Sequence, residues 1–236
     1  MKVVILAGGY GTRLSEETDL IPKPMVKIGE MPILWHIMSI YSFYGLNEFV
    51  ICLGYKGDQI VNFFKKNNNK KWKVHLIETG QETVTGGRLK RVKNIIGKED
   101  FCFTYGDGLT NAKVSDIIDF HKKNKKLATV LAVQPPERFG VLSIDKKNNV
   151  NGFFEKYSGT KTYINGGFFV LSPKVIDFID GDHISWEHEP VKKICSLGEM
   201  AAFKHHDFWY AMDTLKDKRY LNDLWTKNIA PWKVWQ

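Results

Sequence analysis

The first two dozen residues constrain the fold more than any other stretch of the chain. Residues 2–7 (KVVILA) are almost wholly apolar, which is the pattern of a strand buried on both faces of a parallel sheet. They lead directly into residues 8–14 (GGYGTRL), where glycines permit a sharp turn, expose backbone N–H groups and let a ligand approach closely. Because open α/β sheets bind ligands at the carboxyl ends of their strands, we predict an α/β fold with a binding loop at residues 8–14.

One cation lies within this loop and a second follows it. Arg13 lies within it and has the guanidinium geometry that donates two hydrogen bonds to one phosphate group. Lys23 lies between Pro22 and Pro24, which hold it on a stiff, extended segment. Glycine N–H groups combined with two cations predict a site that binds a triphosphate.

Other interpretations of the loop fit less well. A dinucleotide fingerprint requires Gly-x-Gly-x-x-Gly, but Leu14 stands where the third glycine belongs, and no acidic residue ends the apolar run 50–55. A P-loop requires Gly-Lys-Ser or Gly-Lys-Thr, and the loop contains neither. A plain glycine turn is the remaining alternative, and the presence of Arg13 and Lys23 argues against it.

Composition sets further bounds. Of the 236 residues, 43% are hydrophobic and 25% are charged, as in a globular protein with a substantial core. No apolar run approaches the roughly 20 residues that span a bilayer, and Lys2 leads into the first strand without a signal peptide. We therefore expect a cytoplasmic protein with no membrane partner. The three cysteines, Cys52, Cys102 and Cys195, lie far apart and are expected to be small core residues.

The formal net charge of +8 raises the question of a nucleic-acid partner. Most of the positive charge comes from lysines in scattered pairs, such as 65–66 and 122–123, which indicate solvated loops and helix faces. An arginine stripe interleaved with aromatic residues, the mark of a nucleic-acid surface, is missing from the sequence. We expect attraction of small anions and no nucleic-acid partner.

The rest of the chain alternates between apolar strands and amphipathic helices. Predicted strands are 48–53, 74–77, 101–105 and 128–133, and predicted helices are 31–41, 60–64, 85–96 and 114–123. From residue 135 the chain is strand-rich, with strands at 141–144, 150–154 and 163–171 and helices that open at 185–190 and 208–214. This order predicts a Rossmann-like mixed, mainly parallel central sheet flanked by helices, within one composite domain over residues 1–236.

Two further stretches carry chemistry. Thr85 suits a helix N-cap, and Gly86 and Gly87 after it would leave open N–H groups that a base or phosphate can approach. The alternative is a glycine-rich helix entry packed on the sheet. Asp107 lies between Gly106 and Gly108 at the end of strand 101–105, where a carboxylate can hold Mg²⁺ against phosphates. An Asp-Gly pair is also a common turn.

At this point a resemblance adds to the chemistry. The glycine loop followed by Pro22-Lys23-Pro24 resembles the signature of the sugar-phosphate nucleotidyltransferases. The later motifs resemble the glucose-1-phosphate cytidylyltransferase family in order, down to the segment Ala230-Pro231-Trp232. They are residues 86–91 (GGRLKR), 104–108 (TYGDG), 138–140 (RFG), 155–156 (EK), 164–170 (INGGFFV) and 212–214 (MDT).

The resemblance implies roles for particular residues. Residues that would bind the nucleotide are Leu6, Ala7, Gly8, Gly9, Gly11, Thr12, Arg13, Lys23, Thr85, Gly86 and Arg88. Those that would line the acceptor pocket are Tyr105, Arg138, Glu155, Lys156, Asn165 and Gly166. Asp107 and Asp213 would bind Mg²⁺, and Arg13, Lys23 and Lys156 would be the catalytic cations. Residues 1–134 would then be mainly the nucleotide-binding half and residues 135–236 mainly the acceptor-binding half.

The implied reaction is Mg²⁺-dependent transfer of CMP from CTP to the phosphate of a small acceptor, with release of pyrophosphate. The acceptor phosphate is already anionic at pH 7, so the reaction needs positioning and charge neutralisation and no base. The family acceptor is glucose 1-phosphate, which gives CDP-glucose for surface polysaccharides. Copies of the chain would associate as a homo-oligomer.

Two departures from the family pattern keep alternatives open. The segment between Phe64 and Glu78 is shorter than is typical, and Tyr157 stands where the family motif Glu-Lys-Pro has proline. The same chemistry on L-glutamine phosphate, for capsule phosphoramidate, is one alternative. A catalytically silent module that senses nucleotides is an alternative from another class of protein.

Overall fold

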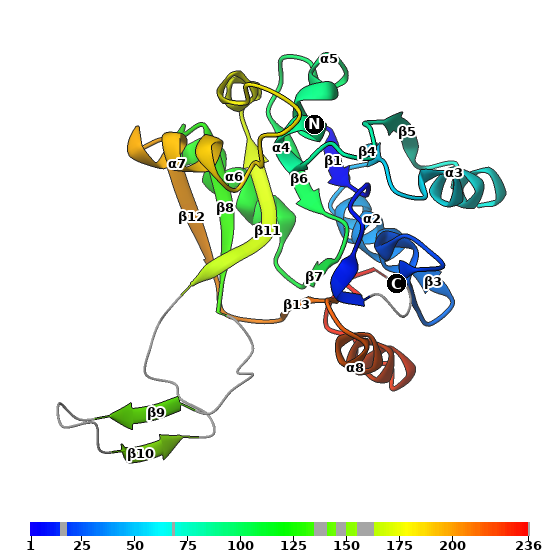
Figure 1. Cartoon of the computed structure of the whole chain (residues 1–236), viewed down its shortest axis with the longest axis vertical. Helices are drawn as coiled ribbons and strands as arrows, with labels where there is room; N and C mark the ends of the chain where they lie inside the picture. The colour runs from blue at the N-terminus through cyan, green and yellow to red at the C-terminus, as the bar shows by residue number, and fades with distance from the viewer. Residues whose placement is uncertain (15–17, 68, 135–140, 145–149, 155–162, 236) are drawn as a thin grey trace.

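A computed structural model describes residues 1–14, 18–67, 69–134, 141–144, 150–154 and 163–235, with backbone only at Arg13, 141–144 and 150–154. A seven-stranded sheet forms its centre, in the order β12-β8-β11-β6-β1-β4-β5 (Figure 1). Its strands are β1 (Val3–Leu6), β4 (Glu48–Leu53), β5 (Lys73–Glu78), β6 (Phe101–Tyr105), β8 (Ala128–Val133), β11 (Ile164–Leu171) and β12 (Met200–His205). Only β11 runs antiparallel to its neighbours in this sheet, which confirms the predicted mixed, mainly parallel sheet.

Helices cover both faces of this sheet. Alternate residues of a strand point to opposite faces, so neighbouring residues of β1 pack against different helices. Val3 and Ile5 of β1 belong to a core cluster that includes residues of α2, α3, α6 and α8. Val4 and Leu6 belong to a second cluster that includes residues of α4, α5 and α7. The helices are α2 (Ile33–Phe43), α3 (Gly57–Lys66), α4 (Thr85–Arg91), α5 (Lys93–Ile96), α6 (Val114–Asn124), α7 (Glu189–Ser196) and α8 (Leu215–Thr226). Burial on both faces explains why β1 is apolar throughout.

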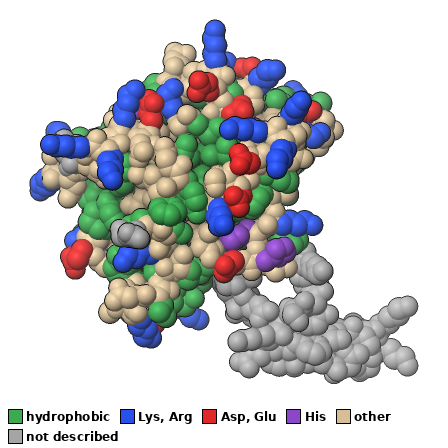
Figure 2. All heavy atoms as spheres, turned by 180° about the vertical axis from the view of Figure 1, so that it is seen from behind, with side chains coloured by type: hydrophobic (Ala, Val, Ile, Leu, Met, Phe, Trp, Pro, Cys, Tyr) green, Lys and Arg blue, Asp and Glu red, His purple; other side chains and the backbone are tan. Residues whose placement is uncertain are grey.

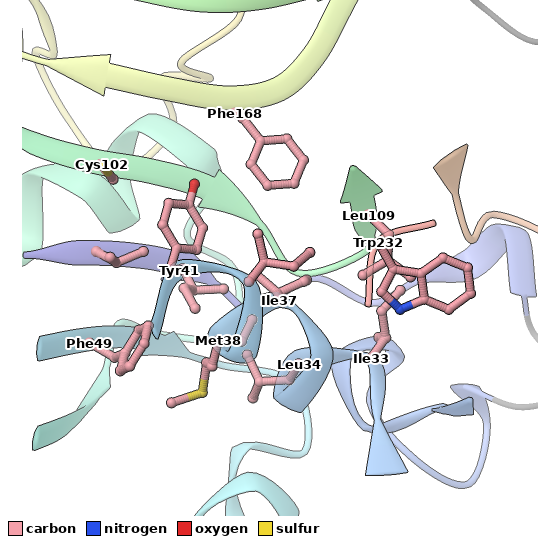
Figure 3. Packing of buried hydrophobic residues seen from close by; sticks show 14 of the residues in the cluster. Ile33, Leu34, Ile37, Met38, Tyr41, Phe49, Cys102, Leu109, Phe168 and Trp232 are labelled. Carbon is pink, nitrogen blue, oxygen red and sulfur yellow. The ribbon is translucent and has the colours of Figure 1, made fainter. Parts of the chain in front are cut away.

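The first cluster is centred on α2. Figure 3 shows Ile37 and Tyr41 of this helix pointing towards the ring of Phe168 on β11. The rings of Tyr41 and Phe168 stack with their centroids 6.1 Å apart. This contact joins a helix from the first half of the chain to a strand from the second half, so the two halves share one core.

Three pairs of short antiparallel strands lie outside the seven-stranded sheet in the described residues. β2 (Lys27–Ile28) pairs with β3 (Met31–Pro32), β9 (Val141–Ile144) pairs with β10 (Val150–Phe154), and β7 (Gly108–Thr110) pairs with β13 (Trp209–Ala211). The chain also forms the short 3₁₀ turns η1 (Thr12–Leu14), η2 (Lys23–Met25) and η3 (Pro173–Phe178). The β7–β13 pair lies at the carboxyl end of β6 and is the one that shapes the site.

Three sequence predictions need correction. The helix predicted up to Ile96 is two helices, because Val92 (φ −97°, ψ 7°) leaves the helical conformation between α4 and α5. Residues 208–214 do not open a helix, because Trp209–Ala211 pairs as β13 and α8 begins only after the N-cap Thr214. Cys52 and Cys102 are core residues as predicted, but Cys195 is exposed on α7.

Charged side chains are spread over the surface. On the face seen in Figure 2, Lys and Arg side chains are dispersed and Asp and Glu side chains lie among them. A nucleic-acid surface gathers its cations along one stripe, and the face seen in Figure 2 does not show one. The absence of a nucleic-acid partner stays a prediction. Among the residues that the structure describes, no helix is long and apolar enough to cross a membrane.

Candidate active site

The site is centred on Lys23, the first residue of η2. Its ammonium nitrogen Nζ lies 2.7 Å from Oδ2 of Asp107 and 2.7 Å from Oδ1 of Asp213. The lysine side chain is 10% exposed, and the two aspartates are 26% and 18% exposed. Burial alone would lower the pKa of Lys23, but the two carboxylates outweigh it and raise the pKa above its ordinary value. Lys23 therefore carries a positive charge at physiological pH.

The β7–β13 pair brings the two aspartates together. Asp107 lies two residues after the end of β6, and its carbonyl oxygen accepts a hydrogen bond of 2.9 Å from the backbone N–H of Met212. The next residue, Asp213, donates its own backbone N–H to Oδ2 of Asp217 in the first turn of α8, at 3.0 Å. A capping box between Thr214 and Asp217 fixes that helix start. The predicted metal-binding pair is thus adjacent in space.

Two neighbouring cavities meet at this cluster. The larger, about 660 Å³, is lined by Leu6, Ala7, Gly9, Tyr10, Gly11, Thr12, Lys23, Pro24, Gln81, Glu82, Thr83, Val84, Thr85, Arg88, Tyr105, Gly106, Asp107, Asn165, Ser185 and Glu187. The smaller, about 190 Å³, is lined by Thr104, Tyr105, Asp107, Gly108, Asn165, Gly166, Gly167, Trp209, Ala211 and Asp213. They share Tyr105, Asp107 and Asn165. Most predicted site residues therefore border one continuous cleft.

Some predicted site residues lie elsewhere. Gly8 and Gly86 line neither cavity and instead make room for other groups. Arg138, Glu155 and Lys156 lie outside the described residues, as does the side chain of Arg13.

The buried side chain of Arg88 holds the start of the glycine loop by hydrogen bonds. Its guanidinium donates to the carbonyl oxygens of Gly8 (2.9 Å) and Leu53 (2.8 Å) and to Oγ1 of Thr79 (2.8 Å). The side chain is nearly fully buried, and burial lowers the pKa of its guanidinium. A Cβ atom at Gly8 would lie 2.2 Å from Nη1 of Arg88, so glycine is required there. Arg88 reaches the wall of the larger cavity while holding three segments of backbone together.

The glycine pair at the start of α4 packs against residues 182–186. The N–H of Gly87 donates to the carbonyl oxygen of Ile184 at 3.2 Å, and a Cβ atom at Gly86 would lie 2.4 Å from the same oxygen. The prediction that Gly87 offers an open N–H to a ligand is therefore wrong, because a neighbouring segment already accepts it. Thr85 is not the N-cap either, because Val84 holds that position and Thr85 is the first helical residue.

Glu187 is a site residue that the sequence analysis missed. One carboxylate oxygen accepts from the hydroxyl of Tyr105 at 2.5 Å, and the other accepts from the hydroxyl of Thr85 at 2.6 Å. Burial and the neighbouring carboxylate raise the pKa of Tyr105 well above its ordinary value. The sequence signalled only that 185–190 opens a helix. Glu187 precedes α7, and nothing local to it predicts partners on β6 and α4.

The smaller cavity has a hydrogen-bonded frame. The indole N–H of Trp209 donates to the carbonyl oxygen of Gly166 at 2.6 Å. Oδ1 of Asn165 accepts from the N–H of Gly167 at 2.8 Å, and its Nδ2 donates to the hydroxyl of Tyr105 at 3.4 Å. These bonds fix polar groups around a space suited to a small polar ligand.

The donor set at the junction of the cavities fits a hard divalent cation. The carboxylates of Asp107 and Asp213 converge on one point, because the ammonium of Lys23 contacts both. Mg²⁺ is commonly held by one or two carboxylates together with water and substrate phosphates, without a complete protein cage. Within the described part of the chain, no group of three or more His, Cys, Asp or Glu residues forms such a cage. The pair therefore suits a metal that arrives with phosphate ligands.

Comparison with known proteins identifies the class of protein that has this fold and site. Residues 2–218 match the family model for nucleotidyl transferases, so the chain belongs to the nucleotidyl transferase family and is an enzyme of that class.

Its relatives narrow the class. The chain is 48% identical to glucose-1-phosphate cytidylyltransferase of Salmonella typhimurium and 41% identical to the probable glucose-1-phosphate cytidylyltransferase of Bacillus subtilis, in both cases over the full length of both proteins. The fold matches the crystal structure of HddC from Yersinia pseudotuberculosis with a TM-score of 0.77 and 30% identity, over 95% of this chain and 99% of that one. These matches confirm the resemblance to the glucose-1-phosphate cytidylyltransferase family.

Proposed function

We propose that this protein transfers CMP from CTP to the phosphate of glucose 1-phosphate, forming CDP-glucose and releasing pyrophosphate. The names of the full-length relatives support the donor and the acceptor. One observation carries the proposal: Lys23, Asp107 and Asp213 converge where two cavities of different size meet. A transferase that joins a nucleotide to a smaller phosphate needs two adjoining sites with charged groups between them.

The two substrates divide between the cavities. The larger cavity takes CTP, with its phosphates against the loop 8–14 and Lys23 and its base towards residues 81–85. The smaller cavity takes part of the acceptor, next to Tyr105 and Asn165. Most of the nucleotide site then comes from residues 1–134 and much of the acceptor site from residues 135–236.

The chemistry follows from charge and position. An oxygen of the acceptor phosphate attacks the α-phosphorus of CTP, the bond from that phosphorus to the bridging oxygen breaks, and pyrophosphate leaves with the electron pair. Lys23 and Arg13 neutralise charge on the CTP phosphates, and Lys156 binds the acceptor phosphate. Asp107 and Asp213 would hold Mg²⁺, which when bound supplies positive charge to the phosphate oxygens.

The non-sugar acceptor L-glutamine phosphate is a second candidate. Only residues 67–72 connect α3 to β5, and the match to the Salmonella protein runs over 258 positions, more than the 236 residues of this chain. The short segment noted in the sequence would account for part of this difference in length. A silent nucleotide sensor is disfavoured, because a sensor has no need of the Lys23–Asp107–Asp213 cluster.

A panel of nucleotides tests the donor. The protein is incubated with glucose 1-phosphate, Mg²⁺ and CTP, UTP, dTTP or GTP, and released pyrophosphate is measured for each. The proposal predicts release with CTP far above that with the other three. Release that is highest with another nucleotide would contradict it.

A further inference from the structure

The position of Lys23 conflicts with the simple idea that Asp107 and Asp213 together bind one metal ion. Its ammonium occupies the point on which both carboxylates converge, 2.7 Å from each, and this is where a cation shared by Asp107 and Asp213 would sit. Two cations cannot occupy one position, so a metal held by both aspartates and the observed position of Lys23 exclude each other. One must displace the other.

Electrostatics explains why a lysine occupies the point between the two carboxylates. The two carboxylate oxygens are no more than about 5.4 Å apart, since each lies 2.7 Å from the same nitrogen. Two carboxylates this close repel each other, and partial burial weakens the screening by water. An ammonium between them offsets the repulsion and keeps both in place.

The backbone of Lys23 is held in place by its neighbours. Pro22 and Pro24 flank it, and the carbonyl oxygen of Lys23 accepts from Val26 within η2. The four-carbon side chain of Lys23 is flexible, so its ammonium can move between the two carboxylates and phosphates bound at the loop 8–14. Both positions border the larger cavity.

We propose that Lys23 is an internal counter-cation that positions Asp107 and Asp213 before substrate binds and leaves them when a metal–triphosphate arrives. Without nucleotide, a metal ion can bind only by displacing the ammonium from both carboxylates. No substrate anion is then present to accept that ammonium. With a triphosphate bound, the ammonium gains phosphate oxygens as new partners, so the exchange becomes favourable. Metal and nucleotide then bind with positive coupling. This inference rests on the proposed function only in taking the aspartates as metal ligands.

Binding of Mn²⁺ without nucleotide tests the inference directly. Electron paramagnetic resonance of free Mn²⁺ gives the dissociation constant for the wild-type protein, for Lys23→Met and for Lys27→Met, an exposed lysine on β2 that serves as the matched control. We expect Lys23→Met to bind Mn²⁺ at least tenfold more tightly than wild type, and Lys27→Met to match wild type. Equal affinity in wild type and Lys23→Met would overturn the inference.

Thermal unfolding of the same proteins gives a second readout. In EDTA, Lys23→Met should unfold at a lower temperature than wild type, because its two carboxylates lack their counter-cation, and Mn²⁺ should restore it. Wild type should respond little to Mn²⁺ alone. Lys23→Gln, whose side-chain amide can still donate hydrogen bonds to the carboxylates, replaces the Met variant if that variant does not fold. Failure of both variants to fold even with Mn²⁺ would contradict the idea that a metal replaces the ammonium.

The outcome can be separated from the proposed function. A wild-type protein that makes CDP-glucose yet binds Mn²⁺ tightly without nucleotide would overturn the role of Lys23 and leave the reaction intact. A protein without that activity that still shows the tenfold difference would support the role of Lys23 and count against the proposed acceptor.

Discussion

The guanidinium of Arg88 donates a hydrogen bond of 2.9 Å to the carbonyl oxygen of Gly8, and so joins α4 to the glycine loop. The same group holds Leu53 and Thr79, at the ends of β4 and β5. The conformation of the loop is therefore set by a buried cation from a distant segment as well as by its own glycines.

Substitution of neighbouring glycines separates these two causes. A Cβ atom at Gly8 would lie 2.2 Å from Arg88 and 2.9 Å from the backbone nitrogen of Gly54, whereas one at Gly9 meets nothing within 4 Å. Gly8→Ala should lower the free energy of unfolding by about 1–3 kcal/mol through overpacking, and the control Gly9→Ala should change it by less than about 0.5 kcal/mol. Denaturant unfolding measures both. Equal effects would show that Arg88 does not constrain the loop.

Neutralising either aspartate should abolish most activity without unfolding the protein. Asp107→Asn and Asp213→Asn keep the size of the side chain but remove charge from the pair proposed to hold the metal, so turnover should fall by about 100-fold or more. Stability should change little, because the remaining carboxylate still accepts from Lys23. Asp177→Asn on η3, an exposed residue paired with Lys93, is the control. Near wild-type turnover in either site variant would show that residue to be a turn or cap.

Glu187 should act through Tyr105, which borders both cavities. Glu187→Gln removes a charge-assisted hydrogen bond to that hydroxyl, and losses of about 1.5–3 kcal/mol are typical, so kcat/KM should fall about 10- to 100-fold. Tyr105→Phe should give a similar loss, and the double variant should be no worse than the poorer single one. The control is Glu189→Gln, exposed at the start of α7. Additive losses in the double variant would contradict a shared role.

His36 should make stability depend on pH. It is buried in α2, where Nε2 contacts the carbonyl oxygen of Ile28 at 3.0 Å and Trp232 donates to Nδ1, so the ring is neutral. Burial lowers the pKa of His36 from 6.5 to about 4. Its folded-state pKa is below its unfolded-state value, so stability is complete above pH 6.5 and is lost progressively down to about pH 4.

A non-titrating variant isolates this contribution. Between pH 7 and pH 5, wild type should lose about 2 kcal/mol more stability than His36→Gln, as the shift in pKa requires. Unfolding in denaturant at each pH gives the two profiles. Parallel profiles would show that His36 is protonated equally in the folded and unfolded states.

The sequence predicted the sheet better than the site. Continuous apolar runs such as 48–53 and 101–105 identified the strands, because a strand buried on both faces has that pattern wherever it lies. The pairing of Trp209–Ala211 with β7 could not be predicted, because three residues carry no periodicity. The contacts of Glu187 were missed for a related reason, since its partners come from segments distant in sequence.

The acceptor is the central claim, and one competition measures it. The protein is supplied with CTP, Mg²⁺ and equal concentrations of glucose 1-phosphate and L-glutamine phosphate, and ³¹P NMR follows the products. The account predicts CDP-glucose as the main product, with one pyrophosphate released for each molecule formed. Preferential transfer of CMP to L-glutamine phosphate, or no product from either acceptor while CTP still binds, would contradict it.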